Sequence, residues 1–169
     1  MAIMLPDPVS SDQTGVVPTI HGSCVVWRNA GVLIIGRSGS GKSQLALALM
    51  ADVAAPGSLV ADDRVVLQAN EGLLVASPPP SLRGKIERFG MGIETHKPLD
   101  CAPLDLVVQL TPRSEMERMP ESHMLIWEHH GIALAKLILP EQPCNGVSAI
   151  FATLNRKPAL AALENRRKR

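Results

Sequence analysis

Aromatic residues are scarce in this chain, which has two Trp, two Phe and no Tyr among its 169 residues. Proteins that bind single-stranded nucleic acid stack the bases on aromatic side chains, so this scarcity argues against that class. An excess of either charge is also lacking, because 17 Lys and Arg stand against 16 Asp and Glu, a formal net charge of +1. A nearly neutral chain gains little attraction to nucleic acid or to an anionic membrane surface, and we expect neither partner.

Cysteine is too sparse for a disulfide framework. Cys24, Cys101 and Cys144 are widely spaced and form no C-x-x-C pair, which also argues against a zinc site. Long hydrophobic runs are missing too, since no stretch approaches the roughly 18 apolar residues of a membrane span. The first residues lack the charged and apolar segments of a signal peptide. We therefore expect a cytoplasmic protein in a reducing compartment.

The residues present suffice for one compact domain, since hydrophobic residues make up 46% of the chain. Residues 1–18 contain three prolines and are expected to form a flexible N-terminal arm, which leaves 19–169 as a single domain. Strand-like segments outnumber helical ones, so we predict an α/β fold with a mixed β-sheet and flanking helices. The predicted strands are 23–27, 31–36, 58–61, 65–68, 73–77, 104–110 and 132–139, and the predicted helices are 43–55, 147–154 and 159–169.

The most specific motif is G-x-x-x-x-G-K-S, placed between a predicted buried strand and a predicted helix. Its glycines let the backbone curl so that successive N–H groups converge on phosphate oxygens, and a helix N-terminus favours an anion. Lys42 would place its charge on the β- and γ-phosphates, and the Ser43 hydroxyl would ligate Mg²⁺. The alternative is a glycine-rich turn that binds nothing. The predicted nucleotide-binding residues are Gly36, Arg37, Ser38, Gly39, Ser40, Gly41, Lys42 and Ser43.

Two adjacent aspartates, Asp62 and Asp63, follow the strand after the predicted helix. Ligand sites of α/β proteins gather at such carboxyl ends of strands. One carboxylate can support a hydrated Mg²⁺ while another accepts a hydroxyl proton. The alternative is a cap between strand and turn, a position that Asp favours. His21, which lies just ahead of the first predicted strand, and Glu87 are ambiguous when taken alone.

Taken in order, these features resemble the catalytic C-terminal domain of the HPr kinase/phosphorylase family, enzymes that phosphorylate a serine of the phosphocarrier HPr. The resemblance covers about residues 20–155. Its most specific parts are the short sequence separation between the G-x-x-x-x-G-K-S motif and the Asp pair, and an E-x-x-G-x-G-I pattern that begins at Glu87. The matching segments are His21-Gly22, residues 36–43, Ala61-Asp62-Asp63-Arg64-Val65, residues 86–93, Glu117-Arg118-Met119-Pro120 and residues 143–146.

The resemblance implies a P-loop-containing mixed sheet similar to the nucleotide-binding core of phosphoenolpyruvate carboxykinase. It implies a protein serine kinase that uses ATP and Mg²⁺ to phosphorylate an HPr-like phosphocarrier of the phosphotransferase system. The chain would be a short form without the family's N-terminal domain, and a homo-oligomer stays open. The implied catalytic residues are His21, Lys42, Asp62, Asp63 and Arg118, and the implied metal ligands are Ser43, Asp63 and Glu87.

Three departures from the family pattern favour the kinase reaction over the phosphorylase reaction. Arg37 stands where family members usually carry an acidic residue, and Phe89 stands where they carry an arginine, with Arg88 one position earlier. A P-G-R-N-like segment linked to dephosphorylation is replaced by Pro-Cys-Asn-Gly at residues 143–146. Two alternatives remain, a nucleotide-sensing module that transfers no phosphate and a small-molecule P-loop kinase. A GTPase is disfavoured because no N-K-x-D guanine motif is present.

Overall fold

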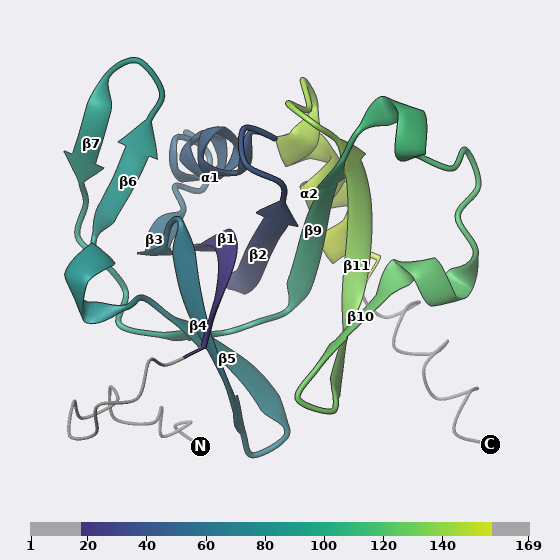
Figure 1. Ribbon diagram of the computed structural model, residues 1–169, viewed down its shortest axis with the longest axis horizontal. Coiled ribbons are helices and arrows are strands. Elements are labelled where there is room, and N and C mark those ends of the chain that lie inside the picture. The colour runs from purple at the N-terminus through teal and green to yellow at the C-terminus, as the bar shows by residue number, and fades with distance from the viewer. Residues whose placement is uncertain (1–17, 157–169) are drawn as a thin grey trace.

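A computed structural model describes residues 18–156, and within that range nine strands form one mixed sheet (Figure 1). The strand order is β10-β11-β9-β2-β1-β4-β5-β8, and β3 also pairs with β1. The predicted helix at 159–169 and nearly all of the predicted N-terminal arm lie outside the described residues. The strands are β1 (Thr19–Trp27), β2 (Ala30–Gly36), β3 (Ser58–Ala61), β4 (Arg64–Asn70), β5 (Leu73–Ser77), β8 (Ala102–Pro103), β9 (Leu106–Thr111), β10 (Ile126–His129) and β11 (Ile132–Pro140).

The centre of the sheet confirms the mixed topology that the sequence predicts. Strand β2 runs parallel to β9 and antiparallel to β1, and β9 runs parallel to β11. The continuous apolar run of β2 is explained by burial on both of its faces. Val32 and Ile34 enter one hydrophobic core, whereas Leu33 between them enters the other.

Strand β1 divides its pairing between two neighbours on one side. Its first residues pair with β4, and Cys24, Val25 and Val26 pair with β3 after a register shift between Cys24 and Val25. His21 therefore lies inside β1, opposite Arg64, and not ahead of the first strand as predicted. The prediction was wrong because the pairing with β4 extends the strand toward the N-terminus.

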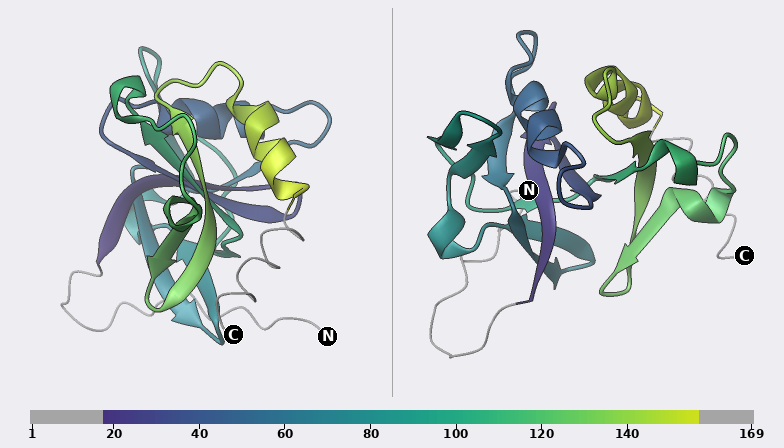
Figure 2. Two further views of the ribbon diagram at one scale, coloured as in Figure 1. Left: turned by 90° about the vertical axis from the view of Figure 1, so that its right-hand side faces the viewer. Right: turned by 45° about the horizontal axis from the view of Figure 1, so that its top comes forward.

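Helices α1 (Lys42–Met50) and α2 (Gly146–Leu154) pack on the same core through Leu45, Leu49 and Ile150 (Figure 2). The α2 prediction is confirmed apart from one residue at its start. The predicted helix at 43–55 ends five residues early. Asp52 leaves the helix because its carboxylate accepts hydrogen bonds from Ala54 N and Trp27 Nε1, both at 3.1 Å.

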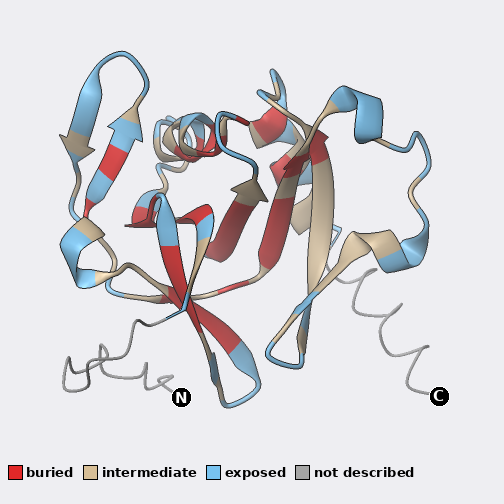
Figure 3. Cartoon of the chain, in the orientation of Figure 1, coloured by how far each residue is buried: buried red, intermediate tan, exposed pale blue. Residues whose placement is uncertain are grey.

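A separate two-stranded hairpin, β6 (Lys85–Arg88) and β7 (Gly92–Thr95), stands beside α1. The buried Ile86 anchors it in the core that α1 covers, whereas its tip is exposed (Figure 3). Residues 80–82 and 113–125 contain only short 3-10 turns, η1 (Pro80–Leu82), η2 (Arg113–Glu115) and η3 (Ser122–Leu125). Among the described helices, none is long and apolar enough to cross a membrane.

Candidate functional site

The loop of residues 36–43 connects β2 to α1, and its backbone conformation depends on glycine. Gly39 and Gly41 have backbone φ angles of 77° and 98°, which residues other than glycine rarely adopt. The N–H groups of Lys42 and Ser43 begin α1 and have no acceptor within residues 18–156. The buried Ser40 hydroxyl likewise has no hydrogen-bond partner in the described part of the chain. Such unpaired donors suit the oxygens of a phosphate group.

Lys42 bends back over the loop that precedes it. Its Nζ donates hydrogen bonds to the carbonyl oxygens of Gly36 at 3.0 Å and Arg37 at 2.8 Å. The side chain is largely buried, and this desolvation lowers the pKa of Lys42, although the nearby Asp62 and Asp63 oppose the shift. The loop therefore holds a cation against acceptors that phosphate oxygens could replace.

The Asp62 carboxylate joins three separate segments of the chain. Its Oδ1 accepts hydrogen bonds from Ser23 Oγ in β1 at 2.5 Å and from Ser43 Oγ in α1 at 2.9 Å. Its Oδ2 lies 3.1 Å from Ser43 Oγ and accepts a hydrogen bond from the backbone N of Glu87 in β6 at 3.2 Å. Only 4% of Asp62 is exposed, so these donors replace the water that a buried carboxylate needs.

Asp63 has a different environment, although it is adjacent in sequence. Its side chain is 60% exposed, and its φ of 65° turns the chain away from β3. His21 Nδ1 lies 3.0 Å from the Asp63 carbonyl oxygen and 3.3 Å from Oδ1. Strand β1 thus contributes a buried Ser23 to Asp62 and a partly exposed His21 to Asp63. The end of β3 therefore carries two carboxylates, of which Asp62 is buried and Asp63 is accessible.

The β6–β7 hairpin places Glu87 beside Asp62 through its backbone, with the Glu87 side chain exposed. Its neighbour Arg88 pairs across the hairpin with Glu94, which also contacts His96 at 3.2 Å. The hydrogen bond from Arg88 holds the pKa of Glu94 below its ordinary value, despite partial desolvation. The Arg88 guanidinium is therefore engaged within the hairpin. Phe89, which follows it, is almost fully exposed.

The segment after β11 packs against the 36–43 loop. Arg37 Nε donates to Glu141 Oε1 at 2.6 Å, and Gln142 N donates to the Ser40 carbonyl at 2.9 Å. A Cβ atom added to Gly41 would lie 3.3 Å from the backbone of Gln142, so the two segments are in close contact. The loop is thus fixed from its outer side by residues distant in sequence.

The structure brings together all of the predicted site residues except Arg118. Asp62 joins Ser43 of the loop to Glu87 of the hairpin, and His21 contacts Asp63. Arg118 lies in the exposed connection between η2 and η3, on the opposite side of the molecule from the β6–β7 hairpin (Figure 1). No ion pair or hydrogen bond joins Arg118 to another residue in the described range. Its predicted role with phosphate stays a prediction.

Sequence reasoning missed Ser23, Glu141 and Glu94, each of which contacts a predicted residue or its neighbour. Their contacts depend on strand pairing and on distant segments, and no local motif marks them. The predicted donors fit Mg²⁺ in kind, since hydroxyl and carboxylate oxygens are its preferred ligands. No three His, Cys, Asp or Glu side chains among the described residues are placed to hold a metal by themselves. In a usual Mg²⁺ site, water and substrate phosphates complete the coordination shell.

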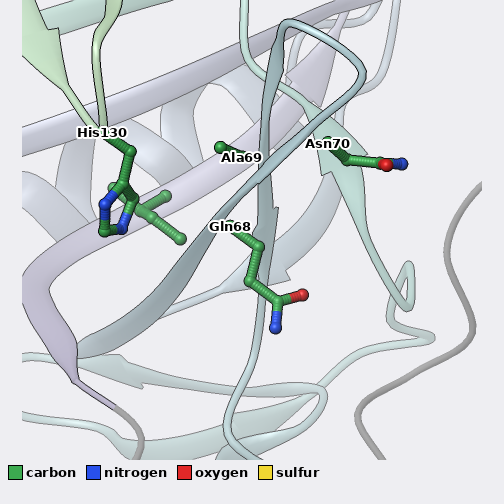
Figure 4. Close-up of a pocket in the computed structure, with 5 residues that line it drawn as sticks. Gln68, Ala69, Asn70 and His130 are labelled. Carbon is green, nitrogen blue, oxygen red and sulfur yellow. The ribbon is translucent and has the colours of Figure 1, made fainter.

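A hollow lies away from this site, between the β4–β5 hairpin and the β10–β11 turn (Figure 4). It has a volume of about 450 Å³ and is widely open. Its lining contains no residue of the loop or the aspartate pair. The lining residues are Leu67, Gln68, Ala69, Asn70 and His130.

Comparison with known proteins finds HPr kinases both among family models and among individual relatives. The HPr Serine kinase C-terminal domain family matches residues 13–162. A protein named HPr kinase/phosphorylase from Caldicellulosiruptor bescii is 35% identical over 162 residues, which cover 89% of this chain and 49% of that protein. One of the same name from Shouchella clausii is 47% identical over 78 residues, 46% of this chain and 24% of that protein.

The fold agrees with these sequence matches. The solved structure of the Hpr(Ser) kinase/phosphatase from Coxiella burnetii matches with a TM-score of 0.68 and 25% identity. The match covers 89% of this chain and 96% of that one. The chain spans about half the length of the curated relatives that it matches over most of its own length.

Proposed function

The chain belongs to the HPr Serine kinase C-terminal domain family, and from this premise we propose that it transfers the γ-phosphoryl group of ATP to a serine of an HPr-like phosphocarrier. The observation that carries the proposal is the contact between Asp62 and Ser43. It places a buried carboxylate on the last residue of a loop with unpaired phosphate-binding donors, next to an exposed carboxylate at Asp63.

The two aspartates divide the chemistry in this proposal. Asp63 is the proton acceptor, because its carboxylate is accessible to a substrate hydroxyl and His21 holds it from one side. The seryl oxygen forms a bond to the γ-phosphorus as the bond to the β,γ-bridging oxygen breaks. The bonding electrons leave with the departing ADP, and the seryl proton passes to Asp63.

Asp62 supports the metal side of the site. Mg²⁺ would be held by the Ser43 hydroxyl, with Asp62 and Glu87 beside it, and would neutralise charge on the phosphates. Lys42 and the N–H groups at the start of α1 would hold the phosphates. The prediction that Asp63 also ligates the metal, and the one that Arg118 handles the phosphoryl group, stay predictions.

A protein acceptor is supported by the surface next to Glu87. Phe89, Met91 and Ile93 on the β6–β7 hairpin are 98%, 77% and 71% exposed, and Ile93 lies directly across the hairpin from Glu87. Contiguous exposed apolar side chains mark protein-binding surfaces. We assign this apolar tip of the hairpin to contact with the carrier beside its acceptor serine. A small-molecule kinase has no need of such a surface.

The kinase direction is favoured over phosphorylase activity, which we expect to be weak or lost. Arg88 is engaged by Glu94, and the segment at residues 143–146 offers no arginine to the 36–43 loop. A nucleotide sensor that transfers no phosphate is the second candidate. The pairing of Arg88 with Glu94 supports it, because this pairing neutralises a cation that could otherwise stabilise the transferred phosphoryl group. Three further predictions stay predictions. They are the P-loop fold similar to phosphoenolpyruvate carboxykinase, the cytoplasmic location and the homo-oligomeric state.

The deciding experiment incubates the protein with γ-labelled ATP, Mg²⁺ and a panel of HPr-like carriers, and maps the labelled residue by mass spectrometry. A labelled serine on one carrier supports the proposal, and the Asp62→Ala/Asp63→Ala double variant should give none while still binding nucleotide. Measurable ATP binding without labelling of any carrier would favour the sensor. Labelling by the double variant at the wild-type rate would refute the assignment of the base.

A further inference from the structure

Ser23 is fully buried in β1, and its hydroxyl donates to Asp62 Oδ1 over 2.5 Å. This distance is at the short end for a hydroxyl bound to an ionised carboxylate, where such bonds are stronger than neutral ones. Asp62 is the only described partner of the Ser23 side chain. The hydroxyl proton is thus committed to a single oxygen atom.

The backbone that carries Ser23 is rigidly placed. Ser23 pairs with Ile34 of β2, and the next residue, Cys24, pairs with Ala61, the last residue of β3. Strand β1 therefore has a neighbour on each side at this point. A donor on such a strand fixes the position of the carboxylate that it contacts.

The other two donors to Asp62 lie outside the main sheet. Glu87 N belongs to the two-stranded hairpin, which shares no strand pairing with the main sheet. Ser43 is the predicted metal ligand, and its hydroxyl can turn its lone pairs toward a cation only while it donates its own proton to the Asp62 carboxylate. The orientation of Ser43 thus depends on Asp62, and that of Asp62 depends most on Ser23.

We propose that Ser23 is a positioning residue that fixes the Asp62 carboxylate, and through it the Ser43 hydroxyl, for binding the magnesium nucleotide. The inference rests on the proposed function for its kinetic consequence, but its binding consequence does not need phosphoryl transfer. Among the described residues, loss of the Ser23 hydroxyl leaves Asp62 Oδ1 with Ser43 as its one donor. The site then binds Mg²⁺ together with nucleotide less well, while the metal-free nucleotide keeps its contacts with Lys42 and the loop.

The matched variants Ser23→Thr and Ser23→Val test this inference, because Thr and Val have the same shape and differ in the hydroxyl. Nucleotide affinity is measured by calorimetry with and without Mg²⁺, alongside kcat, KM and the melting temperature. We expect Ser23→Val to lower kcat roughly 10- to 100-fold relative to Ser23→Thr, as for other misplaced catalytic groups. We also expect it to weaken the Mg²⁺-dependent part of nucleotide binding and to leave the metal-free affinity equal in the two variants.

The outcomes separate positioning from packing. If both variants lose activity and stability equally, Ser23 only fills space and the inference is wrong. If they differ in melting temperature but not in Mg²⁺-dependent binding, the hydroxyl is merely structural and the inference is also wrong. A wild-type protein that labels no carrier refutes the proposed kinase function, whereas the difference in Mg²⁺-dependent binding between Thr and Val still decides the role of Ser23.

Discussion

Arg37 and Glu141, 104 positions apart, form an ion pair with 2.6 Å between Arg37 Nε and Glu141 Oε1. Arg37 follows the first glycine of the G-x-x-x-x-G-K-S motif, and Glu141 follows the last residue of β11. The pair therefore connects the loop after β2 to the segment after β11, at the shared carboxyl end of the parallel strands. An arginine at this position is compatible with the fold because a carboxylate from the β11–α2 connection meets it.

Glu141→Gln should change how stability depends on pH. The hydrogen bond from Arg37 lowers the pKa of Glu141 below its ordinary value of 4.5, so folding favours the ionised form. The stabilisation is complete above about 4.5 and is lost as pH falls through the lowered value in the folded protein. Urea unfolding of wild type and variant between pH 3 and 7 should show a gap that closes at acidic pH. The exposed Glu128→Gln is the control, and a gap independent of pH would contradict the assignment.

Lys42→Met should weaken nucleotide binding and lower phosphoryl transfer by on the order of 100-fold or more, because a buried cation at the phosphates is removed. The change keeps an unbranched chain in the same space, so we expect the melting temperature to change little. Lys85→Met is the matched control, because Lys85 is exposed and its Nζ donates to the Ser81 carbonyl, away from the loop. Equal nucleotide affinity in the two variants, measured by calorimetry, would remove Lys42 from the site.

Asp62→Asn and Asp63→Asn should fail in different ways. Asp63→Asn removes an exposed proton acceptor, so transfer should fall by about 100-fold or more while stability and nucleotide binding persist. Asp62→Asn weakens charge-assisted bonds from three segments and should destabilise the fold by about 2 kcal/mol or more. Urea unfolding and single-turnover labelling together separate the two effects. Equal loss of stability in both variants would show that the aspartates do not divide the roles as proposed.

The Phe89→Ser/Met91→Ser double variant should raise KM for the carrier and leave the affinity for magnesium nucleotide unchanged. Both side chains are exposed at the hairpin tip, so their loss should not destabilise the core. Val53→Ser is the control, because Val53 is 97% exposed but lies in the connection between α1 and β3. Steady-state labelling across carrier concentrations gives KM. An unchanged value would exclude the hairpin tip from carrier contact, and a change in mass by light scattering would assign it to self-association.

The three cysteines should react with iodoacetamide in a fixed order. Cys144 is exposed and should be alkylated first at pH 8. Burial, and then the charge of Asp100, raise the pKa of the Cys101 thiol, which should follow. Burial raises the pKa of Cys24 to about 12, so it should react only when the protein unfolds. Mass spectrometry over time gives the order, and rapid labelling of Cys24 in the folded protein would contradict its burial.

Features determined by nearby residues could be predicted from the sequence. The loop of the G-x-x-x-x-G-K-S motif takes its conformation from Gly39 and Gly41, and the hairpin turn at Glu71-Gly72 contains a glycine that adopts its positive φ readily. The aspartate pair follows β3 as predicted. In each case the determining residues lie within a few positions of one another.

Features determined by distant contacts could not be predicted. The end of α1 depends on Asp52 meeting Trp27, 25 positions away, and the contact of Ser23 with Asp62 depends on the irregular pairing of β1 with β3. A shift of one residue in that pairing would turn Ser23 to the other face of the strand. Without the strand pairing, nothing in the sequence distinguishes Ser23 from the other serines as a partner of Asp62.

The left-handed backbone at Asp63 restricts which side chain can occupy this position. Asp and Asn tolerate a positive φ better than other non-glycine residues, because a short polar side chain can hydrogen-bond locally. Glutamate has the same carboxylate but a longer chain, and it would meet a higher conformational cost here. Glycine would relieve the backbone and remove the acid. The backbone conformation therefore favours aspartate over glutamate, although both carry the same charge. An Asp63→Glu substitution should lower the stability of the fold as well as move the carboxylate.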